Sequence, residues 1–326
     1  MKKKSLLIIT TGGTIAMRYD EEFGIVQNDE LVEYLLNFPQ ISNVADIEVL
    51  EFANVPSPFI DPELMFGLAN LVNEKIIEYD GVIITHGTDT LEETAYMLDL
   101  VVTTRKPVVL TAAMRSGTDL GLDGPRNIVG AVRVASAEEA RNKGVLVVMN
   151  DEIDSARDVV KTDTGKTNSF VSLSYGPLGI IDPDKVIFFR DPVIREKVPT
   201  DKLETNIDLI RCVSGMDSRY IESSISKGAK AIVLEAFGRG NVPRGIIPAI
   251  KEALSKNLII VVVSRSYTGR VLPEYGYEGG GKSLQQMGVI LGGDLRGHKM
   301  RIKLMVLFGR YNNPALVKKY LLHAND

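Results

Sequence analysis

Two segments rich in threonine stand at the ends of short apolar runs. The run from Ser5 to Thr10 leads into Thr-Gly-Gly-Thr-Ile-Ala at 11–16, and the run that begins at Gly81 leads into Thr-His-Gly-Thr-Asp-Thr at 85–90. Ligands bind at the carboxyl ends of the strands in parallel α/β sheets. The positions of the two segments therefore favour hydroxyl chemistry at one end of a sheet.

A lysine after a further apolar run could activate such a hydroxyl. Lys161 lies in Arg-Asp-Val-Val-Lys-Thr at 157–162, past the run from Val145 to Met149. A threonine hydroxyl is a poor nucleophile until a base removes its proton, and a lysine can do so where burial lowers its pKa well below about 10.4. A lysine at such a position is usually only a surface charge. The two hydroxyl-bearing strand ends are what favour a catalytic interpretation.

Each threonine segment also has a purely structural interpretation. Gly12 and Gly13 could serve only the turn. Phosphate binding is weakly indicated, because the sequence lacks the P-loop ending and the three-glycine dinucleotide fingerprint. Asp89 could be a helix N-cap, and Thr90 with Glu93 could form a capping box. Capping and catalysis are compatible.

The three histidines indicate neither a serine triad nor a metal site. The sequence has no Gly-x-Ser-x-Gly elbow and no His-Glu-x-x-His, and no two histidines are close together. His86 is interpreted as a satisfied, partly buried histidine rather than a general base. The acidic cluster at 151–154 lacks the spacing of a calcium loop. No metal site and no cofactor are predicted.

The composition is that of an ordinary soluble globular protein. The chain has 326 residues, 44% of them hydrophobic, and a net charge of −4. A slight acidic excess gives no general attraction to nucleic acid or to anionic membranes. The single cysteine, Cys212, allows no internal disulfide. No stretch approaches the roughly 18 apolar residues of a membrane helix, and no signal peptide is evident at the start, so we expect a cytoplasmic protein.

Apolar runs bounded by turn residues alternate with segments of helical period, which indicates β-α-β units and a largely parallel sheet. Asp61 can cap a helix that has Pro62 at its first position. The expected strands of the first half are Ser5 to Thr10, Ile47 to Phe52, Gly81 to Thr85, Pro107 to Leu110 and Val145 to Met149.

Prolines and weakened periodicity between Tyr175 and Thr200 suggest a boundary between domains. We predict an N-terminal catalytic α/β domain at 1–190, a linker at 191–206 and a smaller C-terminal α/β domain at 207–326. The glycine-rich segment Tyr275 to Lys282 is expected to be a mobile loop. In the second half, strands are expected at Ile207 to Val213, Ala231 to Glu235 and Leu258 to Ser264, and helices near Tyr220 to Lys227 and Pro243 to Leu254.

Three motifs together resemble those of the bacterial-type L-asparaginase and glutaminase-asparaginase family. They are Thr-Gly-Gly-Thr-Ile-Ala at 11–16, His-Gly-Thr-Asp-Thr-Leu-Glu-Glu-Thr at 86–94, and Met-Asn-Asp-Glu-Ile at 149–153 continuing to Arg-Asp-Val-Val-Lys-Thr at 157–162. Each motif alone is weak. Their order and spacing make the resemblance specific, and it extends over nearly the whole chain.

The resemblance implies an α/β protein with a larger N-terminal domain, which has a mostly parallel, mixed sheet flanked by helices, and a smaller α/β C-terminal domain. It implies hydrolysis of the side-chain amide of L-asparagine to L-aspartate and ammonia, without metal or cofactor, and leaves room for a side activity on L-glutamine. It also implies a homotetramer built from tight dimers, in which a neighbouring subunit completes the active site.

Residue roles follow from the same resemblance. Thr14 resembles the nucleophile, which would form an aspartyl-enzyme ester. Thr88, Asp89 and Lys161 resemble a second triad, in which Lys161 tunes Thr88 and Asp89 binds the substrate ammonium. Backbone N–H groups near Thr88 would hold the oxyanion.

Residues that would hold the rest of the substrate match the family less closely. Ser57 matches the serine that holds the α-carboxylate, but Pro58 replaces a position that is often glutamine. Asn241, in Gly-Arg-Gly-Asn at 238–241, resembles a second-domain residue that reaches a partner subunit's pocket, although an asparagine before Pro243 is also a good N-cap. The family's intersubunit glutamate has no clean match; Glu274 and Glu278 flank its expected place.

The loop after the nucleophile departs from the family pattern. The family usually has a catalytic tyrosine there, and Tyr19 is the available hydroxyl in Met-Arg-Tyr-Asp-Glu-Glu-Phe-Gly at 17–24. By spacing, Phe23 is nearer the expected position. Both assignments stay open. If Phe23 holds the position, Tyr19 must reorient to help, or Lys161 and water must handle more of the proton transfer.

Two other functions compete with an asparaginase. An asparaginase-like subunit can supply ammonia in a tRNA-dependent amidotransferase, but such chains carry an additional N-terminal domain. An amino-acid-binding module without turnover is the second alternative, motivated by the altered lid and by Pro58. One methylene usually discriminates by only about 1 to 3 kcal/mol, so the sequence does not decide between asparagine and glutamine.

Overall fold

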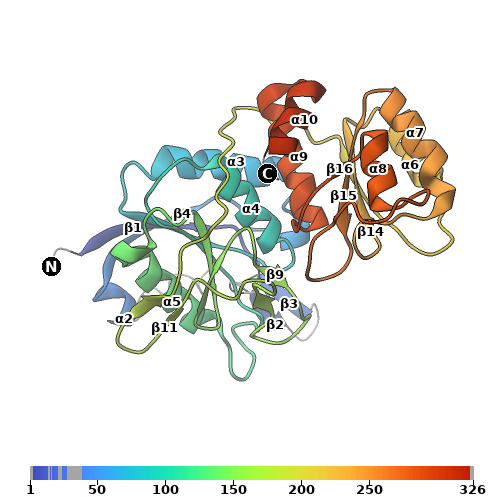
Figure 1. The fold of residues 1–326 in the computed structure, drawn as a ribbon. Coiled ribbons are helices and arrows are strands. Elements are labelled where there is room, and N and C mark those ends of the chain that lie inside the picture. Colours follow the sequence, from blue (N-terminus) through green and yellow to red (C-terminus); the bar gives the residue numbers. More distant parts are fainter. Residues whose placement is uncertain (1–2, 14, 16, 21–23, 28–38, 324–326) are drawn as a thin grey trace. The chain divides into compact units, whose positions relative to one another are not determined.

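The computed structural model describes residues 3–13, 15, 17–20, 24–27 and 39–323. The chain divides into two compact units, an N-terminal unit (1–197) and a C-terminal unit (198–326). Each unit has its own sheet (Figure 1). Each also has its own hydrophobic core. Within the described residues, no helix is both long enough and apolar enough to cross a membrane.

The N-terminal unit is built on an eight-stranded mixed sheet. Its strands are β1 (Lys4–Thr10), β4 (Ala45–Glu51), β5 (Gly81–Thr85), β6 (Val108–Thr111), β7 (Val145–Met149), β8 (Glu152–Ser155), β11 (Gly179–Ile181) and β12 (Val186–Phe188). The strand order is β12-β11-β8-β7-β6-β5-β1-β4. The five strands from β7 to β4 are parallel, and β8, β11 and β12 continue the sheet in antiparallel pairs. The predicted mostly parallel, mixed sheet is confirmed.

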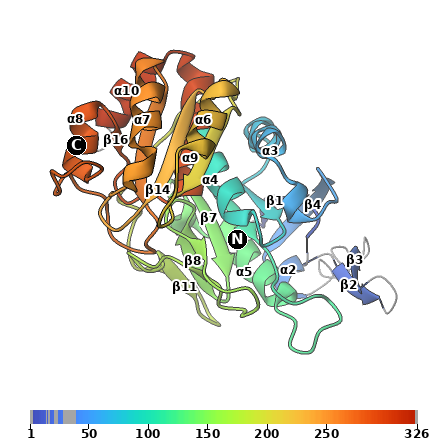
Figure 2. The same cartoon turned by 90° about the vertical axis from the view of Figure 1, so that its right-hand side faces the viewer.

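Helices cover both faces of this sheet, which explains why its central strands are continuous apolar runs. The helices are α2 (Pro39–Ser42), α3 (Pro62–Lys75), α4 (Leu91–Val101) and α5 (Gly124–Ser136). Alternate strand residues such as Leu6, Ile8 and Ile83 join the core under α5 and α2. Figures 1 and 2 show α3 and α4 on the opposite side of the sheet. Every residue of β5, β6 and β7 is buried.

The register of the parallel strands brings three threonines to the same edge of the sheet. Thr10 at the end of β1 is paired with Thr85 at the end of β5, and Thr85 is paired with Thr111 at the end of β6. Because the strands are parallel, the segments that follow them all leave the sheet at this edge. The sheet therefore collects the first two sequence motifs in one place.

Short strands make up the rest of the N-terminal unit. β9 (Val160–Lys161) and β10 (Phe170–Val171) form one two-stranded sheet, and β2 (Met17–Asp20) and β3 (Gly24–Gln27) form another. None of these strands was expected from the sequence, and neither were β8, β11 and β12. Strands of two to four residues are too short to show a period-2 pattern.

The start of α3 follows the sequence prediction. The Asp61 side chain accepts a hydrogen bond from the Leu64 N–H at 2.9 Å, and Pro62 occupies the first turn. The inward face includes Met65 and Leu68, which are buried. The predicted N-cap is therefore confirmed.

Replacing Asp61 with alanine is expected to lower the free energy of unfolding by about 1 kcal/mol, because the Leu64 N–H loses its acceptor. Asp61→Asn keeps a side-chain oxygen and should stay close to the unchanged protein. Urea denaturation followed by circular dichroism measures both variants. Equal destabilisation of the two would show that the loss does not come from the cap hydrogen bond.

The C-terminal unit is a smaller α/β body with an all-parallel sheet in the order β13-β14-β15-β16. Its strands are β13 (Ile207–Arg211), β14 (Ala231–Ala236), β15 (Ile259–Ser264) and β16 (Ile290–Leu291). Its helices are α6 (Arg219–Ser226), α7 (Ile247–Ser255), α8 (Gly281–Met287), α9 (Gly297–Tyr311) and α10 (Pro314–His323). Apolar residues of α6 and α7 share a core with the strands, and α9 contacts β13 and β14. The expected smaller α/β domain is confirmed.

Part of the segment expected to be a loop at Tyr275 to Lys282 is helical. α8 begins at Gly281, and the turn before it is tied by hydrogen bonds from the N–H of Gly280 to the carbonyl of Tyr277 and from Lys282 to Tyr275. A Cβ on Gly280 would lie 2.4 Å from the Tyr275 carbonyl oxygen. Gly280 therefore serves close packing in this turn.

Candidate functional site

The turn after β1 is bound to the end of β5. Both the backbone N–H and the hydroxyl of Thr11 donate to the carbonyl of Thr85, at 3.1 and 3.0 Å. The Thr11 carbonyl in turn accepts from the N–H of Val55 at 3.2 Å. The turn is thus held between β5 and the segment that follows β4.

The two glycines of this turn are required by their conformation and by their neighbours. Gly12 and Gly13 have φ values of 92° and 84°, which L side chains rarely adopt. A Cβ on Gly13 would lie 2.3 Å from the Cα of Gly87, and one on Gly12 would lie 2.7 Å from the backbone of Val55. The predicted sharp glycine turn is present and packs backbone against backbone. Thr14, the next residue, lies outside the described residues.

The end of β5 carries the most direct chemical arrangement in the described part of the chain. The ammonium of Lys161 donates to the hydroxyl of Thr88 at 2.9 Å and to the carboxylate of Asp89 at 2.6 Å. Thr88 is 7% exposed, and the Lys161 side chain is 16% exposed. The Asp89 side chain is 59% exposed, so its carboxylate has room for a second cation. The structure brings together the three residues that the sequence could not connect by spacing.

Lys161 reaches this position from β9, whose backbone is fixed on two sides. Lys161 is paired with Phe170 of β10, and the N–H of Thr162 donates to the carbonyl of Ser169 at 2.7 Å. Before β9, the hydroxyl of Ser155 donates to the carboxylate of Asp158 at 2.9 Å. The lysine therefore stands on a short hairpin whose two strands are hydrogen-bonded to each other, and a side-chain hydrogen bond closes the turn before it.

Ser57 lies against the same loop. It is 4% exposed and opens the 3-10 helix η2 (Ser57–Phe59). Its hydroxyl accepts from the N–H of Asp89 at 3.1 Å, which leaves its own proton available to donate to a ligand oxygen. Pro58 stands in the first turn of η2, where a missing N–H costs little, but it offers no side-chain amide. The serine predicted to hold a carboxylate is thus adjacent to Asp89.

The capping interpretation of this loop is wrong. The N-cap of α4 is Thr90 rather than Asp89, and no side chain makes a cap hydrogen bond there. The Thr90 hydroxyl donates instead to the carbonyl of Ser57 at 2.7 Å, so the expected box with Glu93 is absent. The Ser57 carbonyl competes successfully for the hydroxyl, and Asp89 is left to pair with Lys161.

His86 is completely buried at the end of β5, and both of its ring nitrogens have partners. Nδ1 lies 2.7 Å from the carbonyl oxygen of Gly87, and Nε2 lies 2.9 Å from the hydroxyl of Thr94. Burial lowers the pKa of His86 to about 4. The ring is therefore neutral and satisfied at ordinary pH, as the sequence indicated.

Ile15, which sequence reasoning did not single out, fixes the chain beyond Thr14. It is 2% exposed, and a Cβ on Gly124 would lie 3.3 Å from its side chain. Gly124 begins α5, and Ala113 lies on the same side of it. The sequence contains a signal for this role, because an apolar residue directly after a polar turn usually packs into the core. The residues before and after Thr14 are thus both packed near strand ends.

The predicted lid residue Tyr19 lies in the two-stranded sheet of β2 and β3. The backbone of Tyr19 belongs to β2, where it pairs with Ile25. Its side chain and the whole of Phe23 lie outside the described residues.

The remaining predicted residues belong to the C-terminal unit. Asn241 pairs with Phe237 in an isolated bridge, and its side chain caps no helix, since the N-cap of the 3-10 helix η4 (Arg244–Ile246) is Pro243. Glu274 forms an ion pair with Arg239 at 3.3 Å, and Glu278 forms one with Arg244 at 3.1 Å. The alternative N-cap role of Asn241 is therefore wrong.

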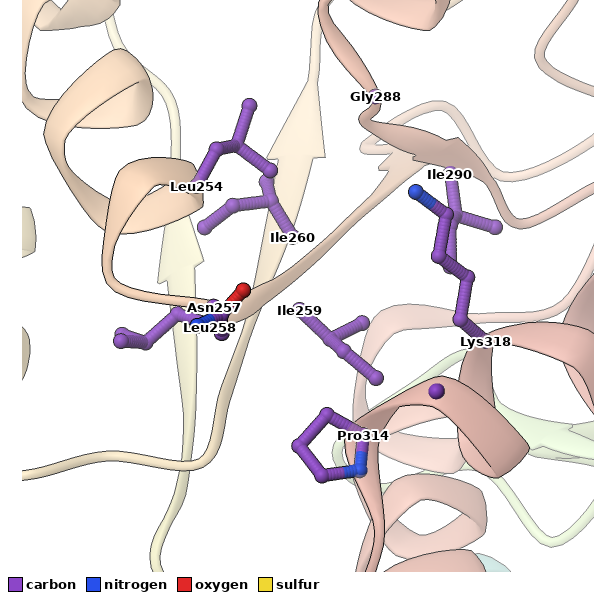
Figure 3. Close-up of a pocket in the computed structure, with 10 residues that line it drawn as sticks. Leu254, Asn257, Leu258, Ile259, Ile260, Gly288, Ile290, Pro314 and Lys318 are labelled. Atoms are coloured by element: carbon purple, nitrogen blue, oxygen red, sulfur yellow. The ribbon is translucent and has the colours of Figure 1, made fainter.

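A cavity of about 220 Å³ in the C-terminal unit has a different character (Figure 3). Its ten lining residues are mostly apolar, and Lys318 is the only charged side chain among them. None of them carries a hydroxyl or a carboxylate, so the cavity offers neither the hydroxyls nor the carboxylate that the sequence motifs supply. Within the described residues, no group of three His, Cys, Asp or Glu side chains is placed to hold a metal ion.

Comparisons with known proteins show the family to which the chain is similar. One family model, described as "Asparaginase, N-terminal", matches residues 5–194, and another, "Glutaminase/Asparaginase C-terminal domain", matches residues 206–321. An L-asparaginase of Bacillus licheniformis is 35% identical over 315 residues, which is 94% of this chain and 96% of that protein. A probable periplasmic L-asparaginase of Haemophilus influenzae is 33% identical over 328 residues, 97% of this chain and 92% of the other.

A solved structure extends the likeness to three dimensions. The crystal structure of a probable cytoplasmic L-asparaginase from Campylobacter jejuni matches with a TM-score of 0.88 and 34% identity. The match covers 98% of this chain and 99% of that one. The chain therefore belongs to the asparaginase family of amidohydrolases.

Proposed function

We propose that this protein hydrolyses the side-chain amide of L-asparagine to L-aspartate and ammonia. Family membership supports the reaction class, and the contact of the Lys161 ammonium with both Thr88 and Asp89 is the observation that carries the chemistry. A hydroxyl with an amine at 2.9 Å has a partner for proton transfer within hydrogen-bond reach. The half-exposed carboxylate beside them suits the ammonium group of an amino acid.

In the proposed reaction, the hydroxyl oxygen of Thr14 attacks the carboxamide carbon while its proton passes to the Thr88-Lys161 pair, and a tetrahedral intermediate forms. Backbone N–H groups near Thr88 stabilise the oxyanion. The intermediate collapses to an aspartyl ester on Thr14, and the amide nitrogen leaves as ammonia with a proton from the Thr88-Lys161 pair. Water then attacks the ester and releases aspartate.

The substrate's other groups have proposed partners in the chain. The carboxylate of Asp89 binds the α-ammonium, and the Ser57 hydroxyl donates to the α-carboxylate. Tyr19 is proposed to assist proton transfer at Thr14, and Asn241 to take part in substrate binding. The close packing of Ser57 against Gly87 supports the proposed role of Ser57, since a Cβ on Gly87 would lie 2.6 Å from that of Ser57.

Ammonia release from L-asparagine and from L-glutamine, measured with the purified full-length protein, tests the function. We expect turnover of asparagine and allow a slower reaction with glutamine. Calorimetric binding of asparagine without ammonia over hours would instead favour a binding module. Co-purification with a partner and binding of tRNA would favour an amidotransferase subunit.

Replacing Ser57 with alanine is expected to raise KM for asparagine about tenfold and to change kcat little, because the hydroxyl contacts a part of the substrate that does not react. Ser57→Thr keeps a hydroxyl and should recover part of the affinity. Steady-state kinetics separate the two constants. A fall in kcat with unchanged KM would contradict the assignment.

The location, oligomeric state and domain division of the protein are also proposed. We infer a cytoplasmic homotetramer, or a dimer of tight dimers, with the domain division at 1–190, 191–206 and 207–326. The tight dimer would supply the second-domain residue that completes the pocket. Light scattering of the purified protein measures the oligomeric state.

A further inference from the structure

The peptide that joins Gly87 to Thr88 is held by a buried ring that the proposed chemistry does not use. The N–H of His86 donates to the carbonyl of Thr111 on β6 at 2.9 Å, which anchors the residue to the sheet. The ring then contacts the Gly87 carbonyl through Nδ1 and the Thr94 hydroxyl through Nε2. His86 and Thr94 are both 0% exposed. The ring therefore links the catalytic loop to the interior of α4.

These two contacts define which ring nitrogen carries the proton. A carbonyl oxygen can only accept, so Nδ1 is the N–H that donates to Gly87. In the neutral ring Nε2 is then an acceptor, and it receives the hydroxyl proton of Thr94. Because the ring is neutral at ordinary pH, it keeps this tautomer while the enzyme works.

Fixing the Gly87 carbonyl also fixes the direction of the next N–H. In a trans peptide the C=O of one residue and the N–H of the following residue point to opposite sides, and the described residues contain no cis peptide. The Gly87 carbonyl points toward the buried ring, so the Thr88 N–H points away from it. The Cα of Gly87 is also closely packed, since a Cβ there would lie 2.6 Å from Ser57 and 3.2 Å from Gly13. The peptide has little freedom to rotate.

We propose that His86 is a positioning residue for the amide hydrolysis, a role that rests on the proposed function: its Nδ1–H holds the Gly87 carbonyl so that the N–H of Thr88 faces the substrate's carboxamide oxygen. The ring neither gives nor takes a proton in the reaction. The ring acts by orienting the N–H that stabilises the oxyanion. Because the charge on this oxygen develops in the transition state, loss of the ring should lower kcat.

Three variants separate positioning from packing. His86→Leu removes the donor, and we expect kcat to fall about tenfold with KM for asparagine within about twofold of the original value. His86→Asn retains a side-chain N–H at the branch position of Nδ1 and should recover most of kcat. Thr94→Val removes only the contact to Nε2 and should leave kcat within about twofold.

If the role of His86 were merely structural, all three variants would have a lower melting temperature. Their kcat would not fall separately from KM, and His86→Asn would not recover kcat. Unchanged kcat in a folded His86→Leu protein overturns the proposal. If His86→Leu does not fold, ¹⁵N NMR of histidine-labelled wild-type protein tests the tautomer directly, and a ring protonated at Nε2 overturns the proposal as well. Absence of asparagine turnover in the wild type is a separate result, which refutes the proposed function itself.

Discussion

Replacing Lys161 with methionine is expected to lower the rate of ammonia release from L-asparagine about 1,000-fold, within the range of general acid–base catalysis. Methionine keeps an unbranched side chain of similar length but cannot exchange a proton with the Thr88 hydroxyl, which now lies 2.9 Å from the ammonium. The fold should persist. Since Asp89 is 59% exposed, the lost ion pair is worth at most about 1 kcal/mol of stability.

Two further variants make this result specific. Lys161→Arg keeps a positive charge beside Asp89, but a guanidinium does not release its proton, so we expect it to stay inactive. If arginine restored turnover, Lys161 would be needed only for its charge. Lys166→Met changes a lysine of the same hairpin whose side chain is 72% exposed, and it should retain full activity. Circular dichroism verifies folding in each case.

The parts of the fold that could be predicted from the sequence are those with a long repeating pattern. The apolar runs that became β1, β5, β6 and β7 are continuous because both faces of the sheet are covered there, whereas β4, at the edge, mixes apolar and charged residues. Their carboxyl ends give the edge where the threonine motifs meet. β9 could not be predicted, since two residues carry no periodicity. Its position is decided by pairing with β10 and by nothing in its own residues.

The residues of the candidate site also differ in how far the sequence predicts their positions. Thr88 and Asp89 follow a strand and could be placed at its end, whereas only the family resemblance connects Lys161 with them in the sequence. In the structure, β9 carries Lys161 to both residues. Local rules failed where a distant group competed. Thr90 satisfies every rule for a capping residue, but the carbonyl of Ser57, 33 positions earlier in the sequence, accepts its hydroxyl. Sequence patterns reflect neighbours along the chain and do not reveal an acceptor that is distant in the sequence.

The second large effect concerns which threonine carries the acyl group. Replacing Thr14 with alanine is expected to lower ammonia release at least about 1,000-fold, because no ester can form. Thr14→Ser keeps a hydroxyl and should retain measurable turnover. In the described residues, however, the hydroxyl beside the lysine belongs to Thr88. Activity measurements alone therefore do not identify the nucleophile, since loss of either hydroxyl would slow the reaction.

Acid quenching during turnover of asparagine, followed by tryptic digestion and mass spectrometry, distinguishes the two threonines. Trypsin places them in separate peptides, Ser5 to Arg18 and Ile76 to Arg105. We expect one aspartyl residue to be added to the first peptide in the wild type and to disappear in Thr14→Ala. An adduct on the second peptide would make Thr88 the nucleophile, with Lys161 as its direct base. The glycine turn at 12–13 would then serve only to shape the pocket around it.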